Sequence, residues 1–347
     1  MEHTIAFSLE DLKEHLNEQQ YSSVFVLVDE NTHTHCLTPF HLALNDSVEY
    51  EVLEVPAGES SKSIEIAYQL WQAMIDLHAD RKSCLINLGG GMITDLGGFI
   101  ASTFKRGISF IHVPTTVLSM VDASIGGKTG VNLEHLKNQV GTFAQPQFVV
   151  ADPIWLSTLS PSEIRSGFAE IIKHGLISPT DYLDACLNTE LTNEGVGKLI
   201  KGSIEIKMTI VQEDPFEQNV RKALNFGHTA GHAYEALSHQ AKTPVLHGDA
   251  VAWGMRVALS LSQMKSGFPV AKAHEIDRFL QTHYGEFKPS FSPKQLWELM
   301  LSDKKNEGGE VKFVLLSAPG HPVVNQTVTF KEFEEALDQL LHNHEEA

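Results

Sequence analysis

The feature that most constrains the fold is a regular alternation, over the first 150 residues, of short apolar runs with segments of helical length. Residues 61–78, between two such runs, carry apolar side chains at helical spacing. Strands separated by helices of this length indicate βαβ units, so we predict an α/β domain with a mainly parallel sheet. Ligands of such sheets bind beyond the carboxyl ends of the strands. The predicted strands are residues 23–28, 50–55, 84–88, 108–113 and 148–151.

The pattern changes near residue 155. From residue 162 onward helical periodicity dominates, as in residues 164–176, 196–211 and 250–264, and only residues 311–316 resemble a late strand. A chain of 347 residues is long enough for two domains, each with its own core. We therefore predict an α/β domain in residues 1–157 and a mainly α-helical domain in residues 158–347.

Charge and composition exclude several classes of protein. The chain has 26 Lys and Arg against 44 Asp and Glu, a formal net charge of −18, which argues against nucleic acid or an anionic membrane as partner. It has no secretory signal pattern and no apolar run of the roughly 18 residues that span a membrane. Its three cysteines lack metal-type or redox-type spacing, which indicates a reducing compartment. We expect a cytoplasmic protein.

Two glycine-rich segments are candidate anion sites. Residues 89–95, GGGMITD, follow a predicted strand and precede a helical pattern, so the backbone could approach a pyrophosphate. Thr94 stands where G-x-G-x-x-G requires its last glycine, so a simple tight turn is an equally open interpretation. Residues 126–130, GGKTG, end like a P-loop, but Asp122 replaces the first glycine. Lys128 could still bind an anion, and a glycine-rich connector is the alternative.

A set of histidines and one glutamate indicates a metal site. His228 and His232 are four residues apart, so on a helix they share one face, and His247 follows in a Leu-His-Gly-Asp segment. Glu170 lies in an apolar helical pattern, with Lys173 one turn later on the same face. Two histidines and one carboxylate suit catalytic zinc. Spacing alone does not separate His228 from His232, and the chain has 18 histidines, so chance proximity is the alternative.

Five segments stand out together: GGGMITDLGGFIAST, FKRGISFIHVPTTVLSMVDASIGGKTGVN, GFAEIIKHGLI, LNFGHTAGHAYEA and LHGDAVAWGM. In this order they resemble successive motifs of the 3-dehydroquinate synthases, which are sugar-phosphate cyclases. The resemblance extends from about residue 20 to residue 340. It implies a homodimer with an N-terminal NAD-binding domain, a Rossmann-like α/β sheet, and a helical domain holding Zn²⁺ or Co²⁺.

The family's reaction converts 3-deoxy-arabino-heptulosonate 7-phosphate, a phosphorylated sugar acid, to 3-dehydroquinate and phosphate on the shikimate route to aromatic amino acids. By resemblance, the steps are a transient oxidation by NAD, elimination of phosphate, return of the hydride, and ring closure by an internal aldol step.

The resemblance assigns roles to residues that match the motifs. The metal ligands would be Glu170, His228 and His247, and His232 would be a catalytic residue beside the metal. The NAD contacts would be Asp29, Asn31, Gly58, Glu59, Lys62, Gly91, Met92, Ile93, Thr94, Asp95, Thr115, Thr116, Lys128, Lys137, Trp155, Leu156, Ser157 and Thr158. The substrate's phosphate and carboxylate would be held by Arg106, Asn138, Lys173, Lys207, Arg221, Asn225 and the pair Lys304 and Lys305, and Asp122 and Lys128 would border both the NAD pocket and the substrate pocket.

The sequence departs from the family pattern in a few places, and it leaves rival functions open. Thr94 replaces a usual glycine, His174 stands where tyrosine is common, and Asp249 replaces a glutamate. The rivals are another sugar-phosphate cyclase, an NAD- and metal-dependent polyol dehydrogenase of the same fold, and a non-catalytic binding protein. Lys173 and Asn225 match the dehydroquinate-forming pattern, and the GGKTG and GHxxGH segments disfavour a plain dehydrogenase.

Overall fold

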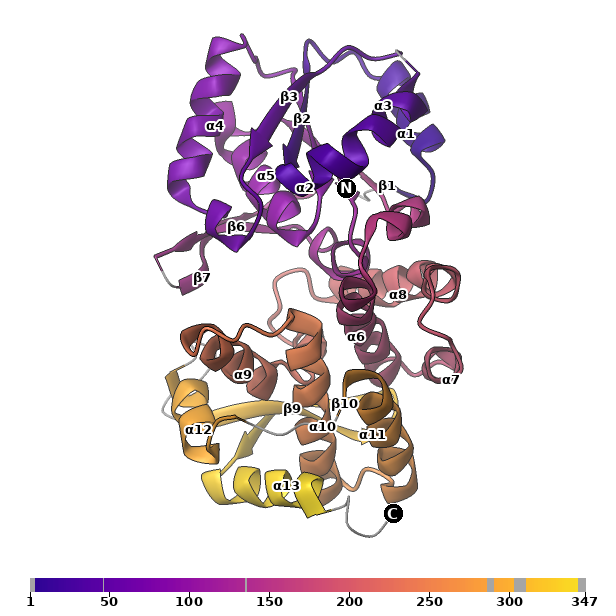
Figure 1. Cartoon of the computed structure of the whole chain (residues 1–347), viewed down its shortest axis with the longest axis vertical. Helices are drawn as coiled ribbons and strands as arrows, with labels where there is room; N and C mark the ends of the chain where they lie inside the picture. The colour runs from indigo at the N-terminus through magenta and orange to yellow at the C-terminus, as the bar shows by residue number, and fades with distance from the viewer. Residues whose placement is uncertain (1–3, 46, 135, 286–289, 303–309, 343–347) are drawn as a thin grey trace. The chain divides into compact units, whose positions relative to one another are not determined.

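The chain folds into two compact units, residues 1–160 and 161–347. The computed structural model describes residues 4–45, 47–134, 136–285, 290–302 and 310–342. The first unit is built around a parallel sheet and the second is rich in helices, which confirms the predicted fold class (Figure 1). No helix in the described ranges is both long and apolar enough to cross a membrane.

A six-stranded parallel sheet forms the centre of the N-terminal unit, in the order β1-β8-β5-β4-β2-β3. Every residue of β4 is buried because both faces of a parallel sheet are covered, which explains why these strands are continuous apolar runs. The predicted strands are confirmed to within one or two residues. The strands of this sheet are β1 (Thr4–Ala6), β2 (Val24–Asp29), β3 (Glu51–Val55), β4 (Cys84–Gly89), β5 (Ser109–Pro114) and β8 (Phe148–Val150).

Helices cover the sheet of the N-terminal unit. Figure 1 shows α4 on one side of the strands and α1 and α3 on the other. Leu70 and Met74 of α4 and Leu96 and Ile100 of α5 belong to one buried cluster. The helices are α1 (Leu9–Glu18), α2 (Glu30–Thr32), α3 (Thr38–Leu44), α4 (Ile64–Asp76) and α5 (Gly91–Thr103). Shorter turns are η1 (His33–Leu37), η2 (Glu59–Ser61), η3 (Phe104–Arg106), η4 (Ser119–Ala123) and η5 (Pro153–Thr158).

Four strands lay outside the sequence prediction: β1, the antiparallel pair β6 (Lys128–Leu133) and β7 (Leu136–Phe143), and β10 (His321–Val328). β1 has three residues, which is too short for a pattern, β7 exposes most of its side chains, and β10 buries only Val328. The GGKTG segment therefore leads into a strand, with Gly126 and Gly127 in the left-handed region, rather than into a P-loop helix.

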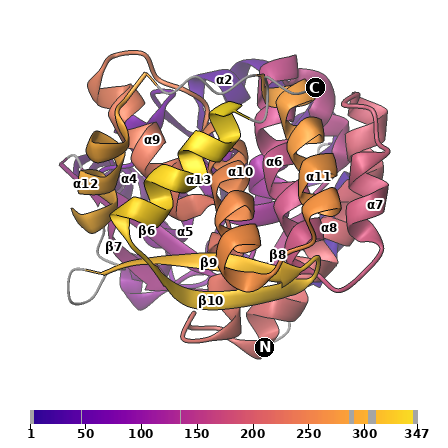
Figure 2. The same cartoon turned by 90° about the horizontal axis from the view of Figure 1, so that it is seen from below.

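The C-terminal unit is a set of helices packed with one antiparallel hairpin. Figure 2 shows β9 and β10 side by side, near α10 and α13. Trp253 of α10, Phe313 of β9 and Phe333 of α13 share its buried core. The elements are α6 (Pro161–Ile177), α7 (Tyr182–Leu187), α8 (Asn193–Glu213), η6 (Val220–Asn225), α9 (His228–Gln240), α10 (His247–Ser266), α11 (Val270–Tyr284), α12 (Pro293–Ser302), β9 (Val311–Ala318), β10 and α13 (Phe330–His342).

Two glycines let α6, α9 and α10 approach closely. A Cβ atom on Gly248 would lie 1.8 Å from the carbonyl oxygen of Ser166 on α6. A Cβ atom on Gly254 would lie 1.9 Å from the carbonyl oxygen of Gly227, just before α9. Larger residues would separate these helices. Gly248 thus serves the contact between α6 and α10.

Candidate active site

In the N-terminal unit, the residues expected to bind NAD follow the carboxyl ends of the strands. After β2 the chain forms β3, which lies on one side of β2, whereas after the neighbouring β4 it forms β5, which lies on the opposite side of β4. The sheet therefore has a topological switch point between β2 and β4, where α/β proteins bind ligands. Asp29 ends β2 and Gly89 ends β4, so the two segments expected to contact NAD flank this point.

The glycine turn after β4 packs against the loop after β5. A Cβ atom on Gly90 would lie 3.3 Å from Thr116 Cγ2, and one on Gly91 would lie 3.4 Å from Ala123 Cβ. Gly90 caps α5, whose free N–H groups and positive dipole end face any ligand at this turn. The Thr94 hydroxyl donates to the carbonyl of Gly91 at 3.1 Å, so this unusual threonine is accommodated inside the first turn of the helix.

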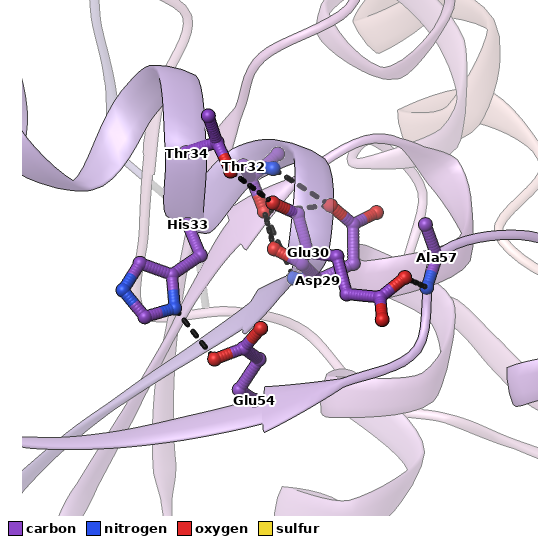
Figure 3. Close-up of polar contacts among 7 residues, drawn as sticks. All are labelled: Asp29, Glu30, Thr32, His33, Thr34, Glu54 and Ala57. Carbon is purple, nitrogen blue, oxygen red and sulfur yellow. Dashed lines mark hydrogen bonds and ion pairs between the residues drawn. The ribbon is translucent and has the colours of Figure 1, made fainter.

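Figure 3 shows how Asp29 is held at the end of β2. Its Oδ1 accepts hydrogen bonds from the backbone N–H of Thr32 at 2.8 Å and from the Thr32 hydroxyl at 3.0 Å. Glu30 accepts from the N–H of Ala57, which ties this turn to the segment after β3. The Asp29 carboxylate is thereby oriented at the switch point, and the exposed Asn31 lies beside it on α2.

Lys62 is buried and joins two predicted site residues. Its Nζ donates to Asp95 Oδ2 and to Asn138 Oδ1, both at 2.5 Å. Burial raises the pKa of Asp95, and the opposing charge of Lys62 does not cancel this effect. Asn138 has a φ of 53° in the left-handed region, and its N–H donates to Asn132. The ammonium group thus links a residue expected to bind NAD to one expected to bind substrate.

The other expected residues of the N-terminal unit lie on several elements. Lys128 begins β6, Lys137 lies on β7, and Asp122 lies on η4. Arg106 is exposed and, with Arg81, lines an open hollow of about 870 Å³ beside Lys82 and Lys105. The remaining ones follow strand ends or lie on short turns and α5: Gly58, Glu59, Met92, Ile93, Thr115, Trp155, Leu156, Ser157 and Thr158.

In the C-terminal unit, Glu170 and Lys173 lie one turn apart on α6. Both side chains are buried, with 0% and 1% exposed, and they form an ion pair. Burial acts to raise the pKa of Glu170, but the charges of Lys173 and of the nearby histidines His228 and His247 outweigh it and hold that pKa well below its usual value. Lys173, expected to contact the substrate, therefore also neutralises a buried carboxylate.

Three histidines converge beside Glu170. Ligand atoms of His228, His232 and His247 lie within 4.8 Å of one another. The Nε2 atoms of His228 and His247 each lie 3.5 Å from Glu170 Oε1. Burial acts to lower the pKa of His247, but Glu170 and Glu235 outweigh it and raise it to about 9.

Glu235 is a residue of this cluster that the sequence reasoning missed. It lies on α9, 7% exposed, and its Oε2 is 3.0 Å from His247 Nδ1. A glutamate within a helix is ordinarily solvated, and only its position seven residues after His228, on the same helical face, could have drawn attention to it.

These residues fit a divalent transition metal. Both carboxylate oxygens of Glu170 are buried: Oε2 pairs with Lys173, and Oε1 faces the Nε2 atoms of His228 and His247, so Oε1 is placed to share an ion with the two imidazoles. One carboxylate and two or three imidazoles form the donor set of catalytic zinc and cobalt sites. Two sets of three ligands are geometrically open: Glu170 with His228 and His247, or the three histidines.

Several expected substrate residues cluster in the same unit. Lys207 is buried on α8, and η6, which carries Arg221 and Asn225, packs against α6 and α8. Arg221 Nη1 donates to the carbonyl of Pro215 at 2.6 Å, and Asn225 Nδ2 donates to Glu217 at 2.6 Å. Lys304 and Lys305 lie outside the described residues.

Comparison with known proteins decides the family. The model for the N-terminal domain of 3-dehydroquinate synthase matches residues 52–166, and the model for its C-terminal domain matches residues 167–306. The chain belongs to the 3-dehydroquinate synthase family. It is 42% identical over 332 residues to the 3-dehydroquinate synthase of Parabacteroides distasonis, covering 94% of each chain. It is 41% identical to that of Methylacidiphilum infernorum, covering 92% of this chain and 88% of the relative.

One solved structure has the same fold as this chain. It is a 2-deoxy-scyllo-inosose synthase complexed with carbaglucose-6-phosphate, NAD⁺ and Co²⁺, with a TM-score of 0.85 and 25% identity over 96% of both chains. The family resemblance inferred from the motifs is therefore confirmed.

The structure explains two departures from the synthase pattern. His174 is buried on α6, and its Nδ1 lies 2.7 Å from the hydroxyl of Ser203 on α8. Asp249 accepts two hydrogen bonds from the guanidinium of Arg165, at 3.1 and 2.9 Å, and so joins α10 to α6. Both side chains hold α6 against a neighbouring helix.

Proposed function

We propose that this protein converts 3-deoxy-arabino-heptulosonate 7-phosphate to 3-dehydroquinate and phosphate. The observation that carries the proposal is the convergence of Glu170, His228 and His247 in a member of the 3-dehydroquinate synthase family. This arrangement supports a reaction in which an alcohol and a ketone oxygen are polarised, as oxidation and enolisation of the substrate require.

The cofactors are NAD and a divalent metal. NAD supplies a hydride acceptor that is restored in each turnover, and the metal, Zn²⁺ or Co²⁺, supplies a Lewis acid. Glu170 and the histidines would hold the metal, with His232 at its edge. The turn from Gly91 to Asp95 and the residues at the ends of β2 and β5 would hold NAD. The binding of NAD⁺ and Co²⁺ by the 2-deoxy-scyllo-inosose synthase supports this assignment.

Basic side chains would hold the substrate. Lys173, Lys207 and Arg221 are each at least 95% buried, so an anion beside them is screened little by water. Such charge-assisted contacts are the strong hydrogen bonds of proteins, and they would orient the phosphate and carboxylate groups. Asn225 and Asn138 would contribute neutral hydrogen bonds.

We propose that the protein is a cytoplasmic homodimer without a nucleic-acid or membrane partner. The net charge of −18 supports this exclusion, because both excluded partners attract basic surfaces. Three buried free cysteines support a reducing compartment.

A comparison of substrates tests the proposed activity. Purified protein with NAD⁺ and Zn²⁺ is given 3-deoxy-arabino-heptulosonate 7-phosphate, sedoheptulose 7-phosphate or glucose 6-phosphate, and phosphate release is followed. We expect release from the first compound alone. Release only from another sugar phosphate would favour the second candidate, a different sugar-phosphate cyclase, which the similarity to the 2-deoxy-scyllo-inosose synthase favours.

A further inference from the structure

We infer that Glu235 is a positioning residue for the metal site. Its carboxylate fixes the orientation and tautomer of His247, and this raises the affinity of the site for a divalent metal. The inference rests on the metal site of the proposed function, and it assigns to Glu235 a role that the family motifs did not give it.

The two nitrogens of His247 face two different carboxylates. Nδ1 lies 3.0 Å from Glu235 Oε2, within hydrogen-bond distance. Nε2 lies 3.5 Å from Glu170 Oε1, on the far side of the ring. A carboxylate that accepts a hydrogen bond from Nδ1–H leaves the lone pair on Nε2, which is the atom that faces Glu170.

His228 shows the same arrangement with a different acceptor. Its Nδ1 lies 3.1 Å from the carbonyl oxygen of Phe226, and its Nε2 lies 3.5 Å from Glu170 Oε1. Both imidazoles therefore have Nδ1 beside an oxygen acceptor and direct Nε2 to the same carboxylate oxygen. Glu235 takes for His247 the part that the backbone takes for His228.

The helices place Glu235 for this role. It lies seven residues after His228 on α9, about two turns, so both side chains extend from one face. The loop that returns the chain to His247 is anchored by Ser238, whose hydroxyl donates to the carbonyl of Glu235 at 2.7 Å and accepts from the N–H of Val245 at 3.2 Å. The hydrogen bonds of Ser238 thus hold the loop between Glu235 and His247.

Metal affinity tests the inference without relying on activity. Metal-depleted full-length protein competes with a chromophoric chelator for Zn²⁺. We expect Glu235→Ala to weaken zinc binding about 10–100-fold, as loss of an outer-shell carboxylate does. Glu235→Gln should lose less zinc affinity than Glu235→Ala, since its amide oxygen can still accept a hydrogen bond from Nδ1–H of His247. If the alanine variant does not fold, the zinc affinity of the glutamine variant decides the test.

A matched control separates positioning from general stability. Arg256 on α10 is 3% exposed, and its Nε donates to Asp277 on α11 at 2.5 Å. Asp277→Asn weakens this buried ion pair at a distance from the histidines in sequence. It should lower the melting temperature, because a buried ion pair is weakened. The zinc affinity should stay within about threefold of wild type, because mutations at sites that share no partner act independently.

A double mutant shows whether Glu235 acts through His247. In a His247→Ala background, Glu235→Ala should cause no further loss of zinc affinity. Folded Glu235→Gln and Glu235→Ala proteins that bind zinc as tightly as wild type would overturn the inference while leaving the proposed metal site intact. Wild-type protein that binds no zinc would overturn both.

Discussion

Lys173 follows Glu170 by one turn of α6, and their buried side chains form an ion pair. Removing one partner of a buried pair leaves the other charge uncompensated in a medium of low dielectric constant, which destabilises a protein strongly. A bound divalent cation would supply positive charge to Glu170 in place of Lys173. Metal binding and the contribution of Lys173 to stability should therefore be linked.

Lys173→Met is expected to lower the free energy of unfolding of metal-depleted protein by about 3–5 kcal/mol. Added Zn²⁺ should restore most of this loss, because the metal neutralises Glu170. Urea denaturation with and without Zn²⁺ measures the effect. The exposed pair of Lys198 with Glu194 on α8 provides the control, and Lys198→Met should leave the free energy of unfolding nearly unchanged in either condition. A loss for Lys173→Met that zinc does not change would contradict the linkage.

The metal content of single variants can distinguish histidines that ligate the proposed metal from histidines that only lie beside it. His247→Ala should reduce bound zinc substantially, because its Nε2 faces Glu170. His232→Ala should retain zinc while turnover falls, if His232 lies beside the metal without ligating it. Metal analysis of the two purified variants measures this difference. An equal loss of zinc in both would instead support the set of three histidines.

Lys62 should couple the NAD residues to the substrate residues. Lys62→Met removes the donor shared by Asp95 and Asn138, and we expect kcat/KM to fall at least about tenfold. Asn138→Gly preserves the left-handed backbone, and combined with Lys62→Met it should cost little more than Lys62→Met alone. The kcat/KM values and NAD⁺ affinities of the four proteins form a double-mutant cycle, with the exposed Lys82→Met as control. Strictly additive effects would mean that Lys62 and Asn138 act independently.

His112 should make stability depend on pH. It is 3% exposed on β5, with Nδ1 3.2 Å from Asn87 Nδ2, and burial lowers its pKa to about 3. The unfolded chain, with a histidine pKa near 6.5, binds a proton that the folded protein does not bind between pH 6.5 and 3. The stabilisation is complete above pH 6.5 and is lost as the pH falls.

From pH 6.5 to 5 this loss amounts to about 2 kcal/mol. His112→Gln removes the titrating group, so the melting temperature of this variant should fall less steeply over that interval than that of wild type. Thermal denaturation at several pH values measures both slopes. Parallel slopes for the two proteins would show that His112 is protonated without cost in the folded state.

The sequence predicted those parts of the structure whose signals are local. β4 is an apolar run because both of its faces are buried, and α4 carries its buried residues Ala67, Leu70 and Met74 at helical spacing. β7 exposes most of its side chains, apolar and polar alike, so no buried face in its sequence separates it from a loop. The pairing of β6 with β7 becomes visible only in the folded chain. The same is true of the contact between Lys62 and Asn138, because these residues are 76 positions apart in the sequence.

The site shows the same division. Glu170 and His228 were predicted because a carboxylate in an apolar helix and paired histidines are unusual in themselves. Glu235 was missed because a glutamate on a helix is ordinary until its partner is known, and His247 reaches it only across the loop between α9 and α10. The motifs pointed to the side chains proposed to bind the metal, and the folded structure was needed to find Glu235 beside His247.

In the proposed reaction, hydride leaves the substrate and returns to it within one turnover. Phosphate and NADH can be followed in the same cuvette with 3-deoxy-arabino-heptulosonate 7-phosphate and NAD⁺ near the enzyme concentration. We expect phosphate in large molar excess over enzyme while the absorbance of NADH stays near zero. NADH accumulating in proportion to product, without release of phosphate, would show that the hydride does not return to the substrate and would indicate a dehydrogenase.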